Sequence, residues 1–149
     1  MSNFQSFHIS VKGILVVKDE FLLLQDIWGA TGRKTVDLPG GRVDTNEMIK
    51  NTLYRELLEE IGVDIKNVQC KIELFDYDQR VRYGIENYQV AELIHRVNLL
   101  ESTKPKISLS EEHVDYFWVN PSTDLTEYEY TSEKQLLLFQ KLQRELKNK

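Results

Sequence analysis

One short segment limits what this chain can fold into more than any other part of its 149 residues. At about 100° per residue, residues 53–61 separate into two faces of a helix. The apolar face carries Leu53, Tyr54, Leu57, Leu58 and Ile61. The opposite face gathers Glu56, Glu59 and Glu60, because residues three and four apart are neighbours on a helix. We therefore expect a helix that packs one face against a core and presents three carboxylates on the other.

Three carboxylates this close together repel one another, which costs a helix roughly a few tenths of a kcal/mol per pair. A bound cation would offset this repulsion. Hard divalent cations prefer carboxylate oxygens, and Mg²⁺ in particular is held by one or two carboxylates together with substrate phosphates. On charge pattern alone, a solvated acidic face is the competing interpretation. The residues around the helix decide between the two.

Those residues form a longer motif of fixed spacing. Gly41 is followed after five residues by Glu47, and after seven more by Arg-Glu-Leu-Leu-Glu-Glu-Ile-Gly-Val at residues 55–63. This pattern resembles the Nudix box at every fixed position and at both aliphatic positions. Seven fixed residues coincide by chance at a given start with a probability on the order of 10⁻⁸. The Leu-Pro-Gly-Gly run at residues 38–41 and the flanking strand pattern extend the resemblance over most of the chain.

The resemblance to Nudix hydrolases implies an α+β fold, an α/β/α sandwich in which a loop, helix and loop lie beside a mixed sheet flanked by helices. It also implies that Glu56, Glu59 and Glu60 ligate a metal together with the carbonyl of Gly40, where the glycine pair lets backbone approach closely. The expected cofactor is Mg²⁺, with Mn²⁺ as the alternative. We expect a catalytic role for all three glutamates.

Arg55 and Glu47 are expected to pair and to orient the carboxylates, although an ordinary surface ion pair is the alternative. In many relatives the base that activates water is a glutamate in a later loop, shortly before a strand that contains Trp. Glu112 occupies the similar place here, and its alternative is a solvated loop carboxylate. The ordinary pKa of a histidine would let His113 act as an acid or base, but a lone histidine beside a strand is more often structural. We therefore do not assign His113 to the catalytic site.

Arg33, Lys34 and Arg42 flank the strand and turn that lead into the box, where relatives often place groups that meet phosphate or base. We assign all three to the substrate, although surface Lys and Arg side chains are commonplace. Aromatic side chains at 28, 75, 77 and 83 can stack on a nucleobase or simply pack the core. Neither set identifies the substrate.

Patterning along the chain predicts the other elements. Apolar and β-branched runs predict strands at residues 7–17, 21–24, 35–38, 68–77, 88–97 and 114–119. One helix is expected over residues 45–61, capped by Asp44 or Thr45 and closed by Gly62. A second, amphipathic helix is expected over residues 132–146.

Length and charge limit the organisation and the partners. The length fits one domain, so residues 1–149 are expected to form a single domain. Nineteen basic and 24 acidic residues give a net charge of −5, so neither nucleic acid nor a membrane is an expected partner. The single Cys70 excludes an intramolecular disulfide and favours the cytoplasm. Charges at Lys12 and Lys18 argue against a signal peptide or membrane span at the start, and a homodimer is left open.

The expected function is metal-dependent hydrolysis of a diphosphate linkage in a nucleoside di- or triphosphate derivative, by attack of water on phosphorus. The partner is then a small nucleotide or another diphosphate. The alternative is a module of the same fold that senses a nucleotide without turnover, against which the intact carboxylates argue. An isoprenoid diphosphate isomerase is a third hypothesis, since such enzymes resemble this fold but use a catalytic cysteine. The single cysteine here, Cys70, lies inside a predicted strand after the motif and gives this hypothesis little support.

Overall fold

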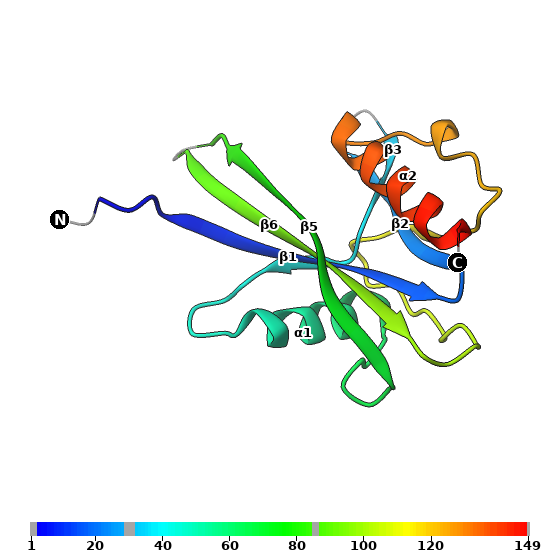
Figure 1. Cartoon of the computed structure of the whole chain (residues 1–149). Coiled ribbons are helices and arrows are strands. Elements are labelled where there is room, and N and C mark those ends of the chain that lie inside the picture. Colours follow the sequence, from blue (N-terminus) through cyan, green and yellow to red (C-terminus); the bar gives the residue numbers. More distant parts are fainter. Residues whose placement is uncertain (1–2, 29–31, 85–86, 149) are drawn as a thin grey trace.

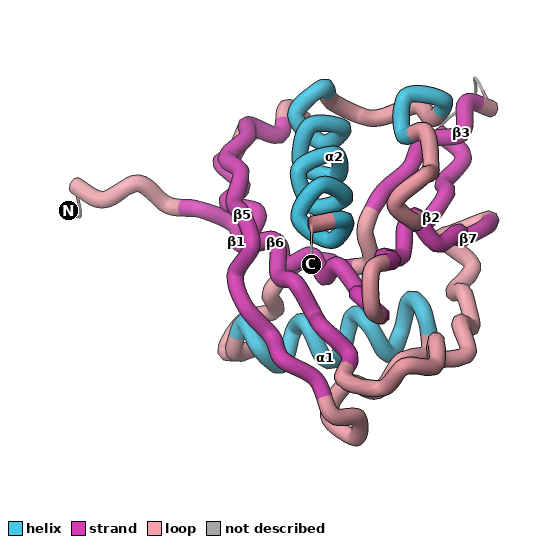
Figure 2. The backbone as a smooth tube through the Cα atoms, turned by 45° about the vertical axis from the view of Figure 1, so that its right-hand side comes forward, coloured by secondary structure: helices cyan, strands magenta, loops and turns pink. Residues whose placement is uncertain are grey.

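The structure is a computed structural model that describes residues 3–28, 32–84 and 87–148. In this part of the chain seven strands form one mixed sheet, and a helix covers each of its faces, as Figures 1 and 2 show. This confirms the expected α+β sandwich. The elements are β1 (Phe7–Val17), β2 (Glu20–Trp28), β3 (Arg33–Asp37), β4 (Gly40–Arg42), α1 (Ile49–Ile61), β5 (Cys70–Arg82), β6 (Tyr88–Leu99), β7 (Asp115–Val119) and α2 (Glu133–Lys147).

Strand β1 organises the sheet. It runs parallel to β6 along its whole length, and the strand order is β3-β2-β1-β6-β5. Its pairing with β2 covers only Val16 with Phe21 and Val17 with Glu20, after which β2 leaves it to pair with β3 and β7. The other end of β1 is therefore free on that side, and the three-residue β4 pairs with it there. This short strand carries the glycine pair of the motif.

The two helices bury separate cores on opposite faces of the sheet. Successive side chains of β1 point to opposite faces, so Val11 and Leu15 face α1 whereas Ile14 and Val16 face α2. Helix α1 contributes three fully buried side chains, Leu53, Leu57 and Ile61. Helix α2 contributes Leu138, Phe139, Leu142 and Leu146. No helix in the described ranges is long and apolar enough to cross a membrane.

Helix α1 differs from the prediction at its start and on its apolar face. It begins at Ile49 with Met48 as N-cap, not at residue 45, because residues 44–47 form a turn in which Asn46 has a φ of 64°. Leu58 is 51% exposed, so the apolar face is narrower than the helical wheel predicted. The predicted end is correct, since Gly62 closes the helix at a φ of 71°.

Strand β5 also differs from the prediction, because it continues to Arg82 rather than ending at residue 77. It contains a β-bulge: Leu74 lies opposite His95, but Asp76 lies opposite Ile94. One extra residue in a strand reverses which face its later side chains occupy. Beyond the bulge, the even-numbered side chains of β5 therefore share the face of Ile94, the face that α2 covers.

Candidate functional site

An acidic hollow lies where α1, β4 and the loop before β7 meet. It has a volume of about 460 Å³ and is lined by Gly40, Gly41, Glu56, Glu59, Glu60, Ser110, Glu111 and Glu112. Five of the eight lining residues are glutamates. Three come from the helix and two from a loop about fifty residues further along the chain, so the fold brings together two acidic segments that the sequence keeps apart.

Glu56 and Glu60 form the buried part of this hollow, with side chains only 12% and 8% exposed. Glu56 lies three residues after Leu53 on α1, and Glu60 lies three residues after Leu57. The packing that buries the two leucines therefore also places these carboxylates against β4. The backbone N–H of Gly40 donates a hydrogen bond of 2.6 Å to Glu60 Oε2. Burial and the neighbouring Glu60 carboxylate both raise the pKa of Glu56, against the opposing effect of Arg55.

The glycine pair is required by this close packing. A Cβ at Gly40 would overlap the carbonyl oxygen of Val11, and its φ of 153° disfavours other residues as well. A Cβ at Gly41 would overlap Oε1 of Glu56. The glycines therefore let β4 lie directly against β1 on one side and against the carboxylates on the other.

The last turn of α1 places the second acidic segment. The carbonyls of Glu60 and Ile61 have no partner within the helix, and they accept hydrogen bonds from the N–H groups of Ser110 (3.0 Å) and Ser108 (2.9 Å). This holds the loop across the helix end, so Glu112 lies near Glu60. One ligand atom each of Glu60, Glu112 and His113 lies within 4.8 Å of the others. The structure thus places the predicted base beside the motif.

His113 is a residue of this site that the sequence reasoning left out. Its side chain is 7% exposed; Nδ1 pairs with Asp26 of β2, and Nε2 lies 3.4 Å from Oε1 of Glu60 without a hydrogen bond. Burial lowers its pKa, but the carboxylates of Asp26 and Glu60 outweigh burial and raise the pKa to about 10. Only the strand pairing reveals this contact, because Asp26 is 87 residues away in the chain.

Arg55 connects the carboxylates to the loop before the helix. Its Nε and Nη2 donate to the two oxygens of Glu47 at 2.8 and 3.0 Å, and Nη1 donates to Glu56 at 2.9 Å and Glu59 at 3.3 Å. Nη2 also donates to the carbonyl of Arg42 at 3.1 Å. The hydrogen bonds to Glu47 are the largest of the effects that raise the pKa of Arg55, which stays charged. The predicted pairing is present in the structure.

The residues present fit a divalent cation. Oxygen donors from Glu56, Glu60 and Glu112 border one hollow, as a hard cation requires. In the described part of the chain, Ser110 Oγ is buried beside these carboxylates without a hydrogen-bond partner. A cation would also relieve the repulsion that raises the pKa of Glu56. Glu59 borders the same hollow, although its side chain is 58% exposed.

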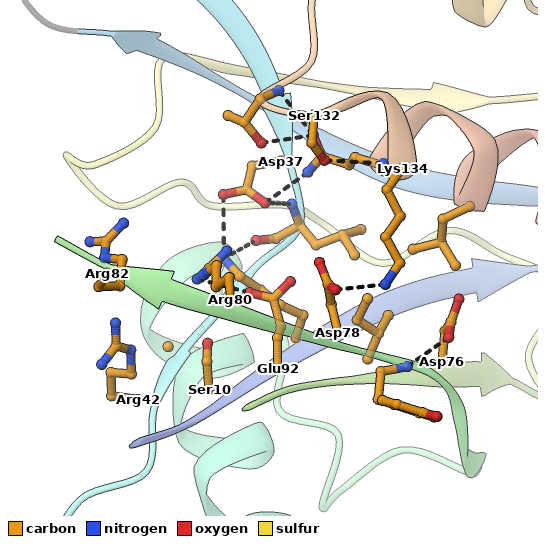
Figure 3. Close-up of a pocket in the computed structure, with 18 residues that line it drawn as sticks. Ser10, Asp37, Arg42, Asp76, Asp78, Arg80, Arg82, Glu92, Ser132 and Lys134 are labelled. Atoms are coloured by element: carbon orange, nitrogen blue, oxygen red, sulfur yellow. Dashed lines mark hydrogen bonds and ion pairs between the residues drawn. The ribbon is translucent and has the colours of Figure 1, made fainter. Parts of the chain in front are cut away.

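A second cavity, of about 430 Å³, opens on the face of the sheet that α2 covers (Figure 3). Gly41 lines both this cavity and the acidic hollow. Arg42, which is predicted to meet the substrate, lines this cavity too. Lys34 is exposed on β3 and borders neither space among the described residues, and the side chain of Arg33 lies outside the described part.

Comparison with known proteins shows the family of this chain. A family model of the NUDIX domain matches residues 6–139. Among curated proteins, the nucleoside triphosphatase NudI of Escherichia coli O139:H28 is 30% identical over 93 residues, which are 62% of this chain and 65% of that protein. The NudI protein of Shigella flexneri matches to the same extent. The aligned region thus spans somewhat under two thirds of these relatives.

Solved structures agree with the fold. A MutT protein from Methanosarcina mazei Go1 superposes with a TM-score of 0.64 at 26% identity, covering 97% of this chain and 98% of that one. The dihydroneopterin triphosphate pyrophosphohydrolase of Escherichia coli superposes with a TM-score of 0.70, covering 97% and 100%. At 15% identity, the second likeness concerns the fold alone.

Proposed function

The chain belongs to the NUDIX family of hydrolases, and we propose that it uses Mg²⁺ or Mn²⁺ to split a diphosphate linkage in a nucleoside di- or triphosphate derivative. The family hydrolyses nucleoside diphosphate derivatives. One observation carries the proposal for this chain: two buried motif carboxylates, Glu56 and Glu60, meet Glu112 in a hollow beside Gly40 and Gly41. The curated relatives are triphosphatases by name, which supports the substrate class.

Glu56, Glu59 and Glu60 would hold the cation, with Gly40 beside them. When bound, the cation supplies positive charge for the diphosphate and lowers the pKa of an attacking water. The protein's own part is to keep the two buried carboxylates in place, which the N–H of Gly40 does for Glu60 and Arg55 does for Glu56. Such fixed support orients ligands and preserves their geometry during turnover.

Glu112 would take the proton from the attacking water. It is exposed on the loop, whereas Glu60 is buried and already accepts a hydrogen bond from Gly40. An accessible carboxylate can exchange its proton with solvent after each turnover, which a buried and bonded one does less readily. Nε2 of His113 lies 3.4 Å from Oε1 of Glu60 and would keep this carboxylate in place, so we assign His113 a positioning role.

The two spaces that meet at Gly41 divide the substrate. The acidic hollow would take the diphosphate, since five of its lining residues are glutamates that can hold a cation. The second cavity would take the remainder of the molecule, because its volume of about 430 Å³ lies within the range of small-molecule sites. Arg42, which follows Gly41 in β4 and lines only the cavity, would meet the substrate from the cavity side.

A substrate panel tests this proposal. Purified protein with Mg²⁺ or Mn²⁺ is incubated with nucleoside di- and triphosphates, nucleotide sugars and dinucleoside polyphosphates, and released phosphate and diphosphate are measured. The same panel is run on Glu60→Gln and on Glu73→Gln. Glu73 is an exposed glutamate of β5 and gives the same change of charge away from both spaces.

We expect wild type and Glu73→Gln to turn over at least one substrate class at similar rates. Glu60→Gln should lose about 100-fold or more in kcat/KM, because a ligand and its bond to Gly40 are weakened together. Titration of Mn²⁺ by paramagnetic resonance should show weaker binding in the same variant. No turnover by wild type across the panel would end the proposal, and full activity in Glu60→Gln would end the metal assignment.

A further inference from the structure

The charged residues that line the second cavity, on the α2 face of the sheet, are mostly paired with one another. Lys12 Nζ lies 3.3 Å from Asp37, Arg80 lies 3.1 Å from Glu92, and Lys134 lies 2.6 Å from Asp78. Three charged lining residues then remain, Asp76, Arg42 and Arg82. Asp76 caps the backbone N–H of Tyr77, which satisfies one of its oxygens. The two arginines lie across the cavity from Asp76 and Lys134 (Figure 3).

Arg42 and Arg82 lie on either side of Tyr88. Arg42 Nη2 donates to the hydroxyl of Tyr88 at 3.4 Å and Nη1 lies 3.2 Å from Nδ1 of His8, whereas Arg82 is directly opposite Tyr88 in the β5–β6 register. The ring of Tyr88 stacks on His8 at 4.2 Å between centroids, which holds the phenol in place. Two arginines thus flank one phenol, and within residues 3–28, 32–84 and 87–148 no carboxylate pairs with either.

This arrangement leaves fork-shaped donors that match phosphate. A guanidinium has five N–H groups, and two such groups side by side can hold a phosphate with several charge-assisted hydrogen bonds. An anion between them would also remove the repulsion between the two positive charges. The cavity provides the room, since both side chains line its about 430 Å³.

The pair does not face the acidic hollow. Successive residues of a strand point to opposite sides, so Arg42 points into the cavity whereas the adjacent Gly41 has Glu56 against its Cα. A phosphate beside Glu56 and Glu60 and a phosphate between Arg42 and Arg82 are therefore different groups. On the basis of the proposed function, we infer that Arg42, Arg82 and Tyr88 form an anion subsite for a phosphate of the substrate outside the cleaved linkage.

Two sources could supply that phosphate: the third phosphate of a triphosphate chain, or a phosphomonoester elsewhere on the nucleoside. The subsite then favours such substrates over nucleotide sugars, which carry only the diphosphate that is cleaved. The arginines would act on binding rather than on the chemical step, so their removal should raise KM and change kcat little.

The first arm of the test measures binding without turnover. Inorganic pyrophosphate is titrated into ¹⁵N-labelled protein in EDTA, where the metal-free acidic hollow repels anions. Saturable shifts of the Arg42 and Arg82 Nε–H signals are expected in wild type and in Arg144→Gln. Arg144 is an exposed arginine of α2 that does not line the cavity. Arg42→Gln and Arg82→Gln should each bind about 10-fold more weakly or worse.

The second arm measures kcat and KM with metal present. Nucleoside 5′-triphosphates, nucleoside 5′-diphosphates that carry an added 3′-phosphate, and nucleotide sugars are compared in wild type, Arg42→Gln, Arg82→Gln and Arg144→Gln. Each cavity variant should lose about 10-fold in kcat/KM on whichever of the first two classes wild type prefers, mainly through KM. That class identifies the source of the phosphate. Nucleotide sugars should be affected less than about twofold.

An equal loss on all three classes, or no saturable shift at either arginine, would overturn the inference. The two arms also separate it from the proposed function. If wild type hydrolyses nothing in the second arm, the proposed function fails, and the pyrophosphate titration alone decides whether the anion subsite exists.

Discussion

The acidic hollow and the arginine pair lie on opposite sides of the same short strand, but the chain builds them differently. The hollow rests on Glu56 and Glu60, four residues apart on one helix, whose spacing alone brings them together. The pair joins Arg42 to Arg82, forty residues apart, through strand pairing and a bulge. Helical spacing can be read directly from a sequence, whereas a contact between two strands depends on register.

The two regions also differ in how firmly their charges are held. Glu60 is 8% exposed and is bonded to the backbone of Gly40. Arg82 is exposed, lies opposite Tyr88 in the sheet and has no carboxylate partner among the described residues. A rigid carboxylate set suits a cation that demands fixed geometry, whereas the guanidinium groups present planar sets of N–H donors that suit a phosphate.

Replacement of Gly41 should have the largest effect, and it should affect the acidic hollow but not the arginine pair. In Gly41→Ala the added Cβ overlaps the Glu56 carboxylate, which must move. Displacement of a catalytic group by about 1 Å can cost about 100-fold in rate, so kcat/KM should fall by about that factor. Pyrophosphate binding to the arginine pair in EDTA should persist.

Gly13→Ala is the matched control for that variant. Its Cβ would meet only the ends of the Leu53 and Leu57 side chains, at 2.9 and 3.3 Å, and these can rotate away. Its activity should stay within about threefold of wild type. Equal losses in both variants would show that any change under α1 disturbs the site, and that contact of Gly41 with Glu56 has no special importance.

A smaller loss of activity is expected from Arg55→Lys, which keeps the positive charge but removes the planar guanidinium group with its several N–H donors. One ammonium group cannot reach both oxygens of Glu47 and also Glu56 in the present geometry. Loss of such positioning groups costs about 10- to 100-fold in activity or metal affinity. Steady-state kinetics and Mn²⁺ titration measure both quantities, with Arg144→Lys as the control. Unchanged metal affinity in Arg55→Lys would contradict the positioning role.

The smallest effect is a pH dependence of stability that involves Glu47. Hydrogen bonds from Arg55 and Thr52 lower the pKa of Glu47 from 4.5 to about 2. The folded state therefore favours the ionised carboxylate, and its contribution is complete above pH 4.5 and disappears as the pH falls toward 2. Urea unfolding should show wild type more stable than Glu47→Gln near pH 6, and the difference should shrink between pH 4.5 and 2. A constant difference would refute this assignment.

Prediction from sequence worked best where structure is local. The limits of β1 and the closing Gly62 follow from strand patterning and a capping residue, and the structure confirms them. Prediction failed where a competing contact intervened. Asp44 and Thr45 have the chemistry of an N-cap, but the turn at residues 44–47 delays the helix to Ile49 so that Glu47 can reach Arg55.

By itself, the sequence determined the NUDIX motif, the facing of its carboxylates and the mixed α+β fold, because helical spacing and strand alternation act between near neighbours in the chain. Only the tertiary structure decided which distant groups join them. The docking of residues 108–110 on the end of α1 brought Glu112 and His113 to Glu60. The bulge in β5 turned Arg82 toward Arg42, since one added residue reverses the face of every side chain that follows it.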